Sequence, residues 1–138
     1  MITYGEILKR LGFAKEKRLV KNSEFKTVMS HRRRFTDGLL VLFVAENDYE
    51  FARLGVSVSK SCGPAVVRNY WKRLLREVFR CNQEQIPSGF DYLLMVSPRW
   101  TKRLDSSAGS EKKPTFEMVR SSFLKLVSGA FDSGVQKQ

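Results

Sequence analysis

Basic side chains in the middle of the chain recur at a spacing that would let them bind a polyanion. The run consists of the amide Asn69 and the cations Arg68, Lys72, Arg73, Arg76 and Arg80. Glu77 is the only acid among them. Residues four apart lie one above another on a helix, so such a row can engage several phosphates at once. The planar fork of arginine suits bidentate phosphate contacts. The alternative is a solvated face around a core, but a solvated face usually mixes charges of both signs.

The residues before and within this run of basic side chains predict a strand followed by a helix, which would hold the basic side chains in place. Residues 52–59 alternate apolar with small or polar side chains, which indicates a strand with one buried face and one small, polar, open face. Pro64 suits the first turn of a helix, because its φ is fixed and it lacks an amide hydrogen. We expect this helix to run to about Arg80. Its predicted inward stripe consists of Val67, Trp71, Leu74 and Val78.

The flanking pattern predicts a helix and a strand before this unit, and a strand and a helix after it. The expected bounds are Asn22 or Ser23 to near Ser30 for the first helix, Leu39–Ala45 for an apolar strand, Asp91–Ser97 for the later strand and Pro114 to Gly134 for the last helix. Asp37-Gly38 favours a tight turn. Residues 102–114 resemble a low-complexity loop. We therefore expect a small sheet covered by helices.

Size and charge limit the class of protein. The chain has 138 residues, of which 42% are hydrophobic, enough for one domain with one modest core. Its 25 Lys and Arg against 14 Asp and Glu give a net charge of +11, which favours a nucleic acid or an anionic membrane as partner. The longest apolar run, Leu39–Ala45, is too short to span a bilayer, so nucleic acid is the better prediction. The first residues show no signal-peptide pattern, and a cytoplasmic location is expected.

Signals for metal binding or catalysis are weak. Cys62 and Cys81 flank a predicted helix of about 17 residues, which separates them by roughly 25 Å, too far for a disulfide. Together with His31 they lack zinc-site spacing, so we expect Cys81 to be a small buried residue and His31 a surface group. The sequence contains no phosphate-binding glycine loop, metal-binding carboxylate cluster or nucleophile elbow. It predicts no catalytic residue and no metal ligand.

Aromatic residues make up 12% of the chain and could stack on unpaired bases, the usual way in which single-stranded RNA is held. The candidates are Phe25, Phe35, Phe43, Trp71 and Trp100. Core packing is the alternative for each of them. Phe25 and Phe43 can contact RNA only if the first helix lies across the open side of the sheet.

Several segments together resemble a known family. They are RLVKNSEFKTVM at 18–29, RLGVSVSK at 53–60, Gly63, AVVRN at 65–69 and KRLLREVFR at 72–80. On these residues the chain resembles the protein subunit of bacterial ribonuclease P, from about Arg18 to Pro98 and more loosely through the final helix. The combination is highly specific, whereas a basic helix alone is not.

The resemblance implies an α+β fold of two layers, a small mixed sheet packed with helices. The implied order is α-β-β-β-α-β-α with a left-handed βαβ crossover, as in ribosomal-protein-like folds. That hand departs from the usual preference, and the residue pattern does not predict it. Residues 1–138 then form a single domain, with an N-terminal extension (1–17), an RNA-binding core (18–98), a flexible loop (99–113) and a C-terminal helix (114–134).

The resemblance also implies a function. The family's holoenzyme is an endoribonuclease that removes the 5′ leader from precursor tRNA, and its RNA is the catalyst, with Mg²⁺ held mainly by that RNA. The implied partners are the catalytic RNA and precursor tRNA, with no membrane and no stable protein partner. The residues implied to face the catalytic RNA are Arg68, Asn69, Lys72, Arg73 and Arg76. Those implied to form a leader-binding cleft between the first helix and the sheet are Phe25, Met29, Phe43, Ser57 and Lys60.

The chain departs from the family pattern at a few positions. Tyr70 replaces the second arginine of an Arg-Asn-Arg signature, which removes a charge but keeps a ring and a hydroxyl. Pro64 stands where asparagine is common, Ser61 replaces a lysine, and Met29 replaces an aromatic residue. Two other functions compete with the one implied. One is a non-enzymatic ribosomal or RNA-assembly protein of related fold, which would not require the cleft residues, and the other is a metal-dependent nuclease.

Overall fold

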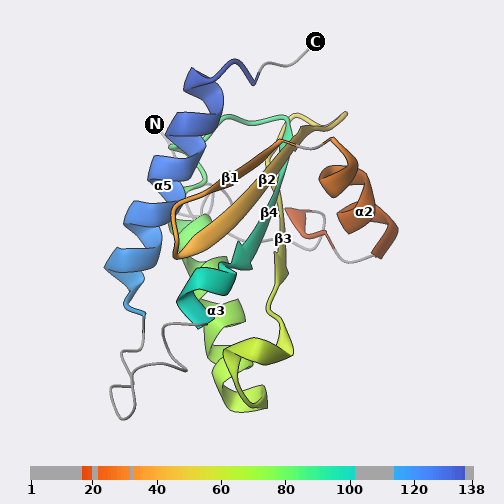
Figure 1. Cartoon of the computed structure of the whole chain (residues 1–138). Coiled ribbons are helices and arrows are strands. Elements are labelled where there is room, and N and C mark those ends of the chain that lie inside the picture. The colour runs from red at the N-terminus through yellow and green to blue at the C-terminus, as the bar shows by residue number, and fades with distance from the viewer. Residues whose placement is uncertain (1–16, 20–21, 32, 102–113, 136–138) are drawn as a thin grey trace, which may run out of the picture.

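A computed structural model describes residues 17–19, 22–31, 33–101 and 114–135, which form a four-stranded sheet with helices around it (Figure 1). The elements in chain order are α2 (Asn22–Ser30), β1 (Arg34–Thr36), β2 (Leu40–Glu46), β3 (Arg53–Ser57), the 3-10 turn η2 (Lys60–Cys62), α3 (Ala65–Asn82), β4 (Phe90–Val96) and α5 (Phe116–Asp132). This order confirms the α-β-β-β-α-β-α arrangement that the resemblance implied.

The sheet is mixed. Its strand order is β1-β2-β4-β3, with β1 and β4 antiparallel to β2, and β3 parallel to β4. The parallel pair is joined through η2 and α3, which makes the expected βαβ unit. The residue pattern missed β1, because three residues at a sheet edge are too few to show an alternation.

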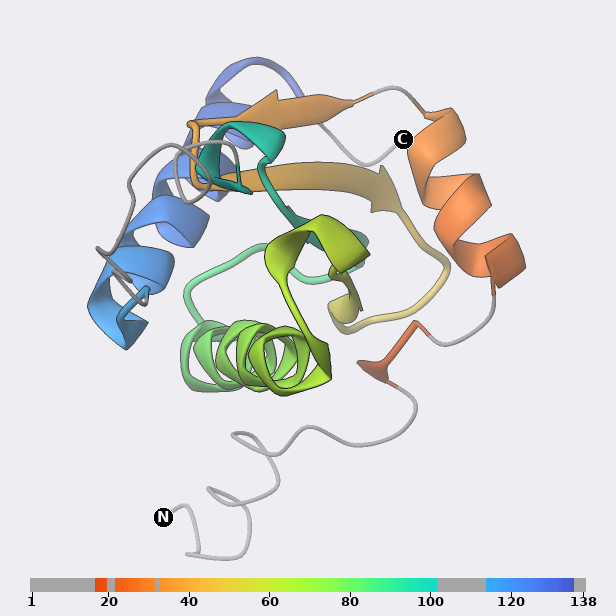
Figure 2. The same ribbon diagram turned by 60° about the horizontal axis from the view of Figure 1, so that its bottom comes forward.

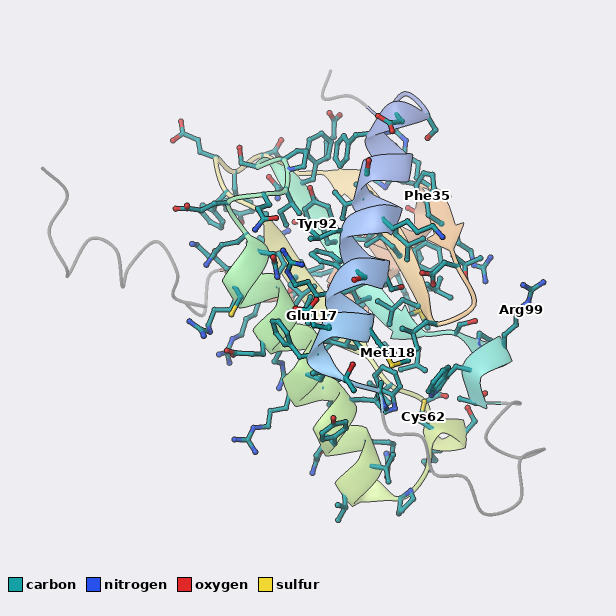
Figure 3. All side chains as sticks on the ribbon, turned by 90° about the vertical axis from the view of Figure 1, so that its left-hand side faces the viewer. Phe35, Cys62, Tyr92, Arg99, Glu117 and Met118 are labelled. Atoms are coloured by element: carbon teal, nitrogen blue, oxygen red, sulfur yellow. The ribbon has the colours of Figure 1, made fainter. Side chains whose placement is uncertain are left out.

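One face of the sheet forms the main core. It carries Leu40, Leu42 and Val44 from β2 and packs against α3 and α5. Tyr92 of β4 lies beneath α5, with its ring 6.3 Å from that of Phe123 in an edge-to-face contact (Figure 3). The hydroxyl of Tyr92 donates to the carbonyl of Pro87 at 2.7 Å, so this buried polar group is satisfied.

The buried stripe of α3 differs in part from the prediction. The predicted residues were Val67, Trp71, Leu74 and Val78, and the helix residues that are buried are Trp71, Leu75, Val78, Phe79 and Asn82. Val67 and Leu74 lie at the border of the core and are only partly buried. The inward direction of α3 is therefore rotated toward Leu75 and Phe79.

The opposite face of the sheet is covered by α2, which lies on the other side of the strands from α5 (Figures 1 and 2). A second hydrophobic cluster fills this contact. It consists of Leu19, Val28, Val41, Phe43, Ala45 and Leu93, with Phe25 and Met95 packed against it. The predicted bounds of α2 are confirmed.

Gly55 shows how closely α2 approaches the sheet. A Cβ atom at Gly55 would lie 2.5 Å from Cε1 of Phe25 and 3.0 Å from Cβ of Leu19, so any larger residue would push α2 away. The expectation that residues 52–59 leave one face open is therefore wrong at Gly55, which is buried. Further along β3, Ser57 stays partly exposed.

The segment before α2 lies along the outer edge of β3. Arg18 forms a parallel bridge to Leu54, and the amide of Leu19 donates to the Leu54 carbonyl at 2.9 Å. Nζ of Lys17 donates to Oε1 of Gln83 on α3 at 3.1 Å. Residues 17–19 thus contact both the sheet and α3, while residues 1–16 of the predicted extension (1–17) lie outside the described residues.

The two cysteines differ from each other in exposure. Both are free, and Cys62 is buried whereas Cys81 is exposed. The expectation that Cys81 is buried is wrong, because it lies on the solvent side of α3 beside Glu77 and Arg80. His31 is exposed, as predicted.

The turn between β1 and β2 links the sheet to α5 through Asp37. Its carboxylate accepts hydrogen bonds from the amides of Leu39 and Leu40 at 3.0 and 3.1 Å, and from the hydroxyl of Ser122 at 2.5 Å. Gly38 follows with a φ of 94°, which confirms the predicted tight turn. Burial alone would raise the pKa of Asp37, but these hydrogen bonds, with the charge of Lys125, outweigh it and lower that pKa.

We expect Asp37→Asn to destabilise the fold at neutral pH and to matter less in acid. Because the folded pKa is depressed, the contribution of Asp37 is full above its ordinary pKa of 3.8 and is lost as pH falls through the folded pKa. Urea unfolding of both proteins at pH 6 and near pH 3 should show the difference shrinking. A difference that stays constant would contradict this assignment, and Ser122→Ala should show a smaller effect with the same trend.

Candidate RNA interface

The outer face of α3 carries all five residues that were predicted to meet the catalytic RNA. The helix begins after Pro64, and Gly63 with a φ of 131° turns the chain into it from η2. At 100° per residue, five polar positions from 68 to 76 fall within about 140° of the helix surface, on the flank that adjoins the buried stripe at Arg68. They are Arg68, Asn69, Lys72, Arg73 and Arg76, which we call the α3 cationic face.

The only acid on this side of α3 neutralises a cation outside the set. Glu77 accepts hydrogen bonds from both Nε and Nη2 of Arg80, at 3.0 and 2.5 Å. The hydrogen bond from Arg80 lowers the pKa of Glu77, so the pair stays charged and compensated. Arg80, which the sequence placed in the same row, is thus already occupied.

The cations of the α3 cationic face differ from Arg80 in their lack of ion pairs with described residues. None of them forms an ion pair with a residue that the structure describes. Arg73 and Arg76 are exposed, Arg68 and Lys72 are partly buried, and Nε of Arg68 is buried with no hydrogen-bond acceptor among the described residues. Arg68 and Lys72 therefore pack partly on the scaffold, and the exposed Arg73 and Arg76 suit a surface that binds phosphates.

Tyr70 lies off this face. It is two residues after Arg68, about 160° around the helix. Its hydroxyl donates to the carbonyl of Pro114 at 2.8 Å, which links α3 to the start of α5. In this chain the signature position occupied by Tyr70 therefore joins two helices.

We expect Tyr70→Phe to lower the free energy of unfolding by about 0.5–1.5 kcal/mol, the usual net contribution of one hydrogen bond. Binding of the catalytic RNA that the resemblance implies should change less than twofold, because the α3 cationic face is intact. Thermal unfolding and a binding titration measure the two effects. Tyr70→Arg should lose the same stability without gaining affinity, and a tenfold gain in affinity would contradict the proposed role.

The side chains on the α2 side of the sheet form two rows across the strands. One row is Arg34, Phe43, Leu93 and Gly55, and the next is Thr36, Val41, Met95 and Ser57. Directly opposed residues carry their side chains on the same face, so each row crosses all the strands. We call them the Phe43 row and the Ser57 row. The ring of Phe25 lies over Gly55 in the Phe43 row, and α2 covers this part of the sheet.

The predicted cleft residues differ in how much surface they offer. Phe43 is 8% exposed and belongs to the cluster under α2, while Met29 is 42% exposed. Phe25 and Ser57 are partly buried, and Lys60 is exposed in η2. Phe25, Phe43 and Ser57 therefore share the α2 side of the sheet with α2 and its residue Met29, whereas Lys60 lies in η2, which contacts α3. Phe43 offers almost no surface to a ligand.

Met95 was missing from the predicted cleft. It is partly exposed, contacts the cluster under α2 and pairs with Ser57 and Val41 in the Ser57 row. The alternation in the strand that begins at Asp91 could have revealed it, since residues 91, 93 and 95 share a face.

Arg53 holds α2 against the sheet. Its Nε and Nη2 donate to the two carboxylate oxygens of Asp91 at 2.8 and 2.7 Å, and its Nη1 donates to Oε2 of Glu24 on α2 at 3.1 Å. Asn47 donates to Asp91 at 2.8 Å, and the ring of Tyr49 stacks on the guanidinium, whose carbon lies 4.5 Å from the ring centroid. The hydrogen bond to Asp91 raises the pKa of Arg53, so the network remains ionic.

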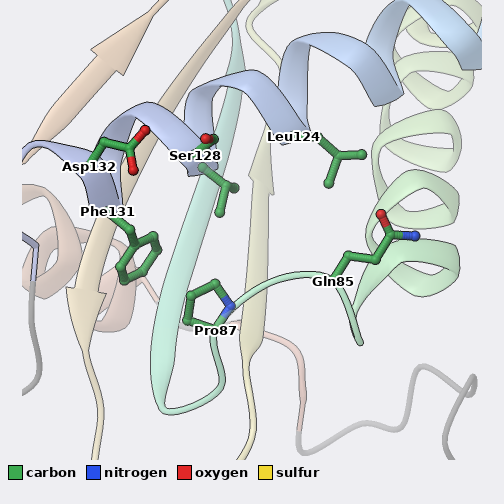
Figure 4. Close-up of a pocket in the computed structure, with 7 residues that line it drawn as sticks. Gln85, Pro87, Leu124, Ser128, Phe131 and Asp132 are labelled. Atoms are coloured by element: carbon green, nitrogen blue, oxygen red, sulfur yellow. The ribbon is translucent and has the colours of Figure 1, made fainter.

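A groove elsewhere on the surface does not suit an RNA ligand. It lies between α5 and the turn that follows α3 (Figure 4). Its lining is Gln85, Pro87, Leu124, Val127, Ser128, Phe131 and Asp132. The lining contains no cation and one acid, so it would repel phosphate.

The described residues contain neither a metal-ion site nor a membrane-spanning helix. No group of three or more His, Cys, Asp or Glu side chains is placed to hold a metal ion. No helix among them has the length and apolar character needed to cross a membrane. The expected absence of metal ligands and catalytic residues in the whole chain stays a prediction.

Comparisons with known proteins agree on one family. The family model described as Ribonuclease P matches residues 13–124. The chain is 32% identical over 118 residues to a ribonuclease P protein component from Clostridioides difficile, covering 85% of this chain and 94% of the relative. It is 40% identical over 79 residues to the one from Alkaliphilus oremlandii, covering 57% of this chain and 69% of that relative.

A solved structure supports the same assignment. The RNase P protein from Thermotoga maritima superposes with a TM-score of 0.68 at 27% identity, covering 81% of this chain and 96% of that one. These matches do not favour the alternative of a ribosomal or RNA-assembly protein. The matched span also includes α2, the sheet and α3, which carry the two surfaces described above. The chain belongs to the ribonuclease P protein family.

Proposed function

We propose that this chain is the RNA-binding protein subunit of ribonuclease P, which assists the catalytic RNA in removing the 5′ leader from precursor tRNA. The observation that carries the proposal is the α3 cationic face, whose cations have no ionic partner among the described residues. It occurs in a chain that belongs to the ribonuclease P protein family. In this proposal, Arg68, Asn69, Lys72, Arg73 and Arg76 bind phosphates of the catalytic RNA.

The second surface would bind the leader. Phe25, Phe43 and Ser57 lie on the α2 side of the sheet, Met29 lies on α2 itself, and Lys60 lies beyond the end of β3 in η2. The exposed members, Met29 and Lys60, would supply an apolar contact and a phosphate contact, and Phe43 would support the surface from beneath. Lys60 begins η2, which leads directly into α3, so the leader surface adjoins the RNA surface.

The chemistry of cleavage would belong to the RNA. The described residues offer no cluster of metal ligands, so the proposal assigns Mg²⁺ to the RNA and no catalytic residue to this chain. The protein would offset repulsion between RNA strands and increase affinity for substrates that carry a leader. Its place of action would be the cytoplasm, where bacterial precursor tRNA is made.

Reconstitution tests this function. The protein is mixed with a bacterial ribonuclease P RNA and precursor tRNA at low Mg²⁺, and cleavage is compared with that by the RNA alone. We expect faster leader removal with the protein. No gain in cleavage would rule out the proposal, and cleavage by the purified protein without RNA would instead support a nuclease.

We expect Met29→Ala to weaken binding of a precursor with a leader about fivefold, as loss of roughly 1 kcal/mol of apolar contact would do. Binding of mature tRNA and of the catalytic RNA should not change. Met29 suits this test better than Phe43, because Phe43→Ala would open a cavity under α2. The matched control is Met118→Ala on α5, since Met118 is 40% exposed and Met29 is 42% exposed. Equal losses from both variants would contradict the cleft assignment.

A further inference from the structure

The strand β1 brings an unassigned arginine to the leader-binding side of the sheet. Arg34 opposes Phe43, which opposes Leu93, so Arg34 lies at the β1 end of the Phe43 row. Two residues further along β1, Thr36 lies at the end of the Ser57 row. Both Arg34 and Thr36 are exposed. The surface described so far was bordered by polar groups at β3 only, and these two residues border it at the opposite edge.

The acids on this side of the sheet are already occupied. Glu24 and Asp91 both bind Arg53. Arg34 forms no ion pair with any described residue, so its charge is not neutralised by these acids. Arg34 therefore places at the β1 edge a cation that has no ion-pair partner among the described residues.

The nearest acid in sequence is also engaged elsewhere. Asp37, three residues after Arg34, accepts a hydrogen bond from Ser122 of α5. Because α5 covers the other face of the sheet, the Asp37 carboxylate is directed away from the leader-binding side. It does not compete with a phosphate for Arg34.

The distance between the two edges suits a single strand of RNA. Neighbouring strands lie about 4.8 Å apart, so Thr36 and Ser57 at the ends of one row are separated by about 14 Å. That length holds up to about four phosphates at a stacked spacing of about 3.4 Å, and fewer in an extended strand. A leader that crosses the sheet along the rows would reach both edges.

We propose that Arg34 binds a leader phosphate at the β1 edge, and that the leader crosses the sheet from β3 to β1. This inference rests on the proposed function. Lys60 leads into α3, which faces the catalytic RNA, so nucleotides close to the cleavage site lie at the β3 edge. Nucleotides farther from the cleavage site reach Arg34. The geometry thus gives the leader a direction on the protein.

The test is a leader-length series with Arg34→Ala. Holoenzyme reconstituted with wild-type or variant protein is titrated with precursor tRNAs whose leaders have one, two, four, six or eight nucleotides. We expect equal affinities for the shortest leaders and a loss of about fivefold once the leader is long enough to reach β1. For the long leaders only, the salt dependence of the association constant should weaken. The magnitude of the slope of its logarithm against log salt should be smaller by about 0.7, the value for one phosphate contact on a single strand.

Matched variants make the result specific. Arg34→Lys should recover part of the affinity, and Lys125→Ala should have no effect, because Lys125 is an exposed cation on α5 at the other face. Thermal unfolding checks that Arg34→Ala is folded. A loss that is the same for every leader length, mature tRNA included, would place Arg34 on another part of the RNA and overturn the proposal, as would no loss at all. A wild-type protein that shows no leader-dependent affinity would instead refute the proposed function.

Discussion

The double variant Arg73→Ala/Arg76→Ala should lose at least a hundredfold in affinity for ribonuclease P RNA at moderate salt. Both side chains are exposed on α3 and have no ionic partner among the described residues. A charge-assisted hydrogen bond contributes about 1.5–3 kcal/mol, and the loss of two such contacts gives this factor. The logarithm of the association constant decreases with the logarithm of the salt concentration, and the magnitude of this slope should be smaller by about 1.8 in the variant. Each phosphate contact contributes about 0.9 to the slope on a duplex. Binding titrations at several salt concentrations measure both quantities.

Arg80→Ala is the matched control for this prediction. Arg80 lies on the same helix but is held by Glu77 through two hydrogen bonds. Its removal should reduce RNA affinity by less than about threefold, because a compensated surface pair contributes little. If Arg80→Ala weakened binding as much as the double variant, total charge rather than the α3 cationic face would determine affinity.

The variant Arg53→Ala should lower the free energy of unfolding by about 3–5 kcal/mol, which is the usual cost of removing one partner of a buried ion pair. The side chains of Arg53 and Asp91 are 14% and 9% exposed, so among the described side chains the variant would leave only Asn47 bound to this carboxylate. Urea unfolding followed by circular dichroism at pH 7 measures the loss. Arg53→Lys should recover little of it, since lysine cannot make the bidentate contact.

Two further variants test the physical reason. Glu24→Gln removes only the ionic character of the contact between Arg53 and α2. Because the Glu24 side chain is 27% exposed, this variant should lower the free energy of unfolding by less than about 1 kcal/mol. Replacing Asp91 together with Arg53 should be less harmful than Arg53→Ala alone, because no buried charge is then left without a partner. A double variant as unstable as the sum of the single ones would contradict this explanation.

Local signals allowed part of this fold to be predicted. The bounds of α2 were predicted from capping residues and helical spacing, and the tight turn was predicted from Asp37-Gly38. The last helix was predicted from its apolar spacing between Pro114 and Gly134, and Gly134 has a positive φ just after the helix ends. These features depend only on neighbouring residues, which the sequence shows directly.

The features that were missed depend on contacts between distant segments. The burial of Leu75 and Phe79 depends on the direction from which the sheet and α5 approach α3. The burial of Gly55 and Phe43 depends on where α2 lies across the sheet, and no local pattern reports that. The place of Met95 in the candidate site likewise required the strand register.

The α3 cationic face could be predicted as a set, since helical spacing alone puts its members on one side. What the sequence could not show is which charges are free. The pairing of Arg80 with Glu77 and the hydrogen bond of Tyr70 to Pro114 separate these residues from the face. Both contacts depend on side-chain geometry, and the second joins residues that are 44 positions apart.

The short pairing of residues 17–19 with β3 covers part of a sheet edge that could otherwise pair with another chain. As the outermost strand, β3 would otherwise present unpaired amide and carbonyl groups, which are a template for another chain. The bridge from Arg18 and the amide of Leu19 occupy the position at Leu54 where such a strand would add. Arg18 is exposed, so a cation marks the edge and discourages a second strongly basic copy from docking there. Residues 17–19 thus leave less of the β3 edge open to pairing with a second copy of the chain.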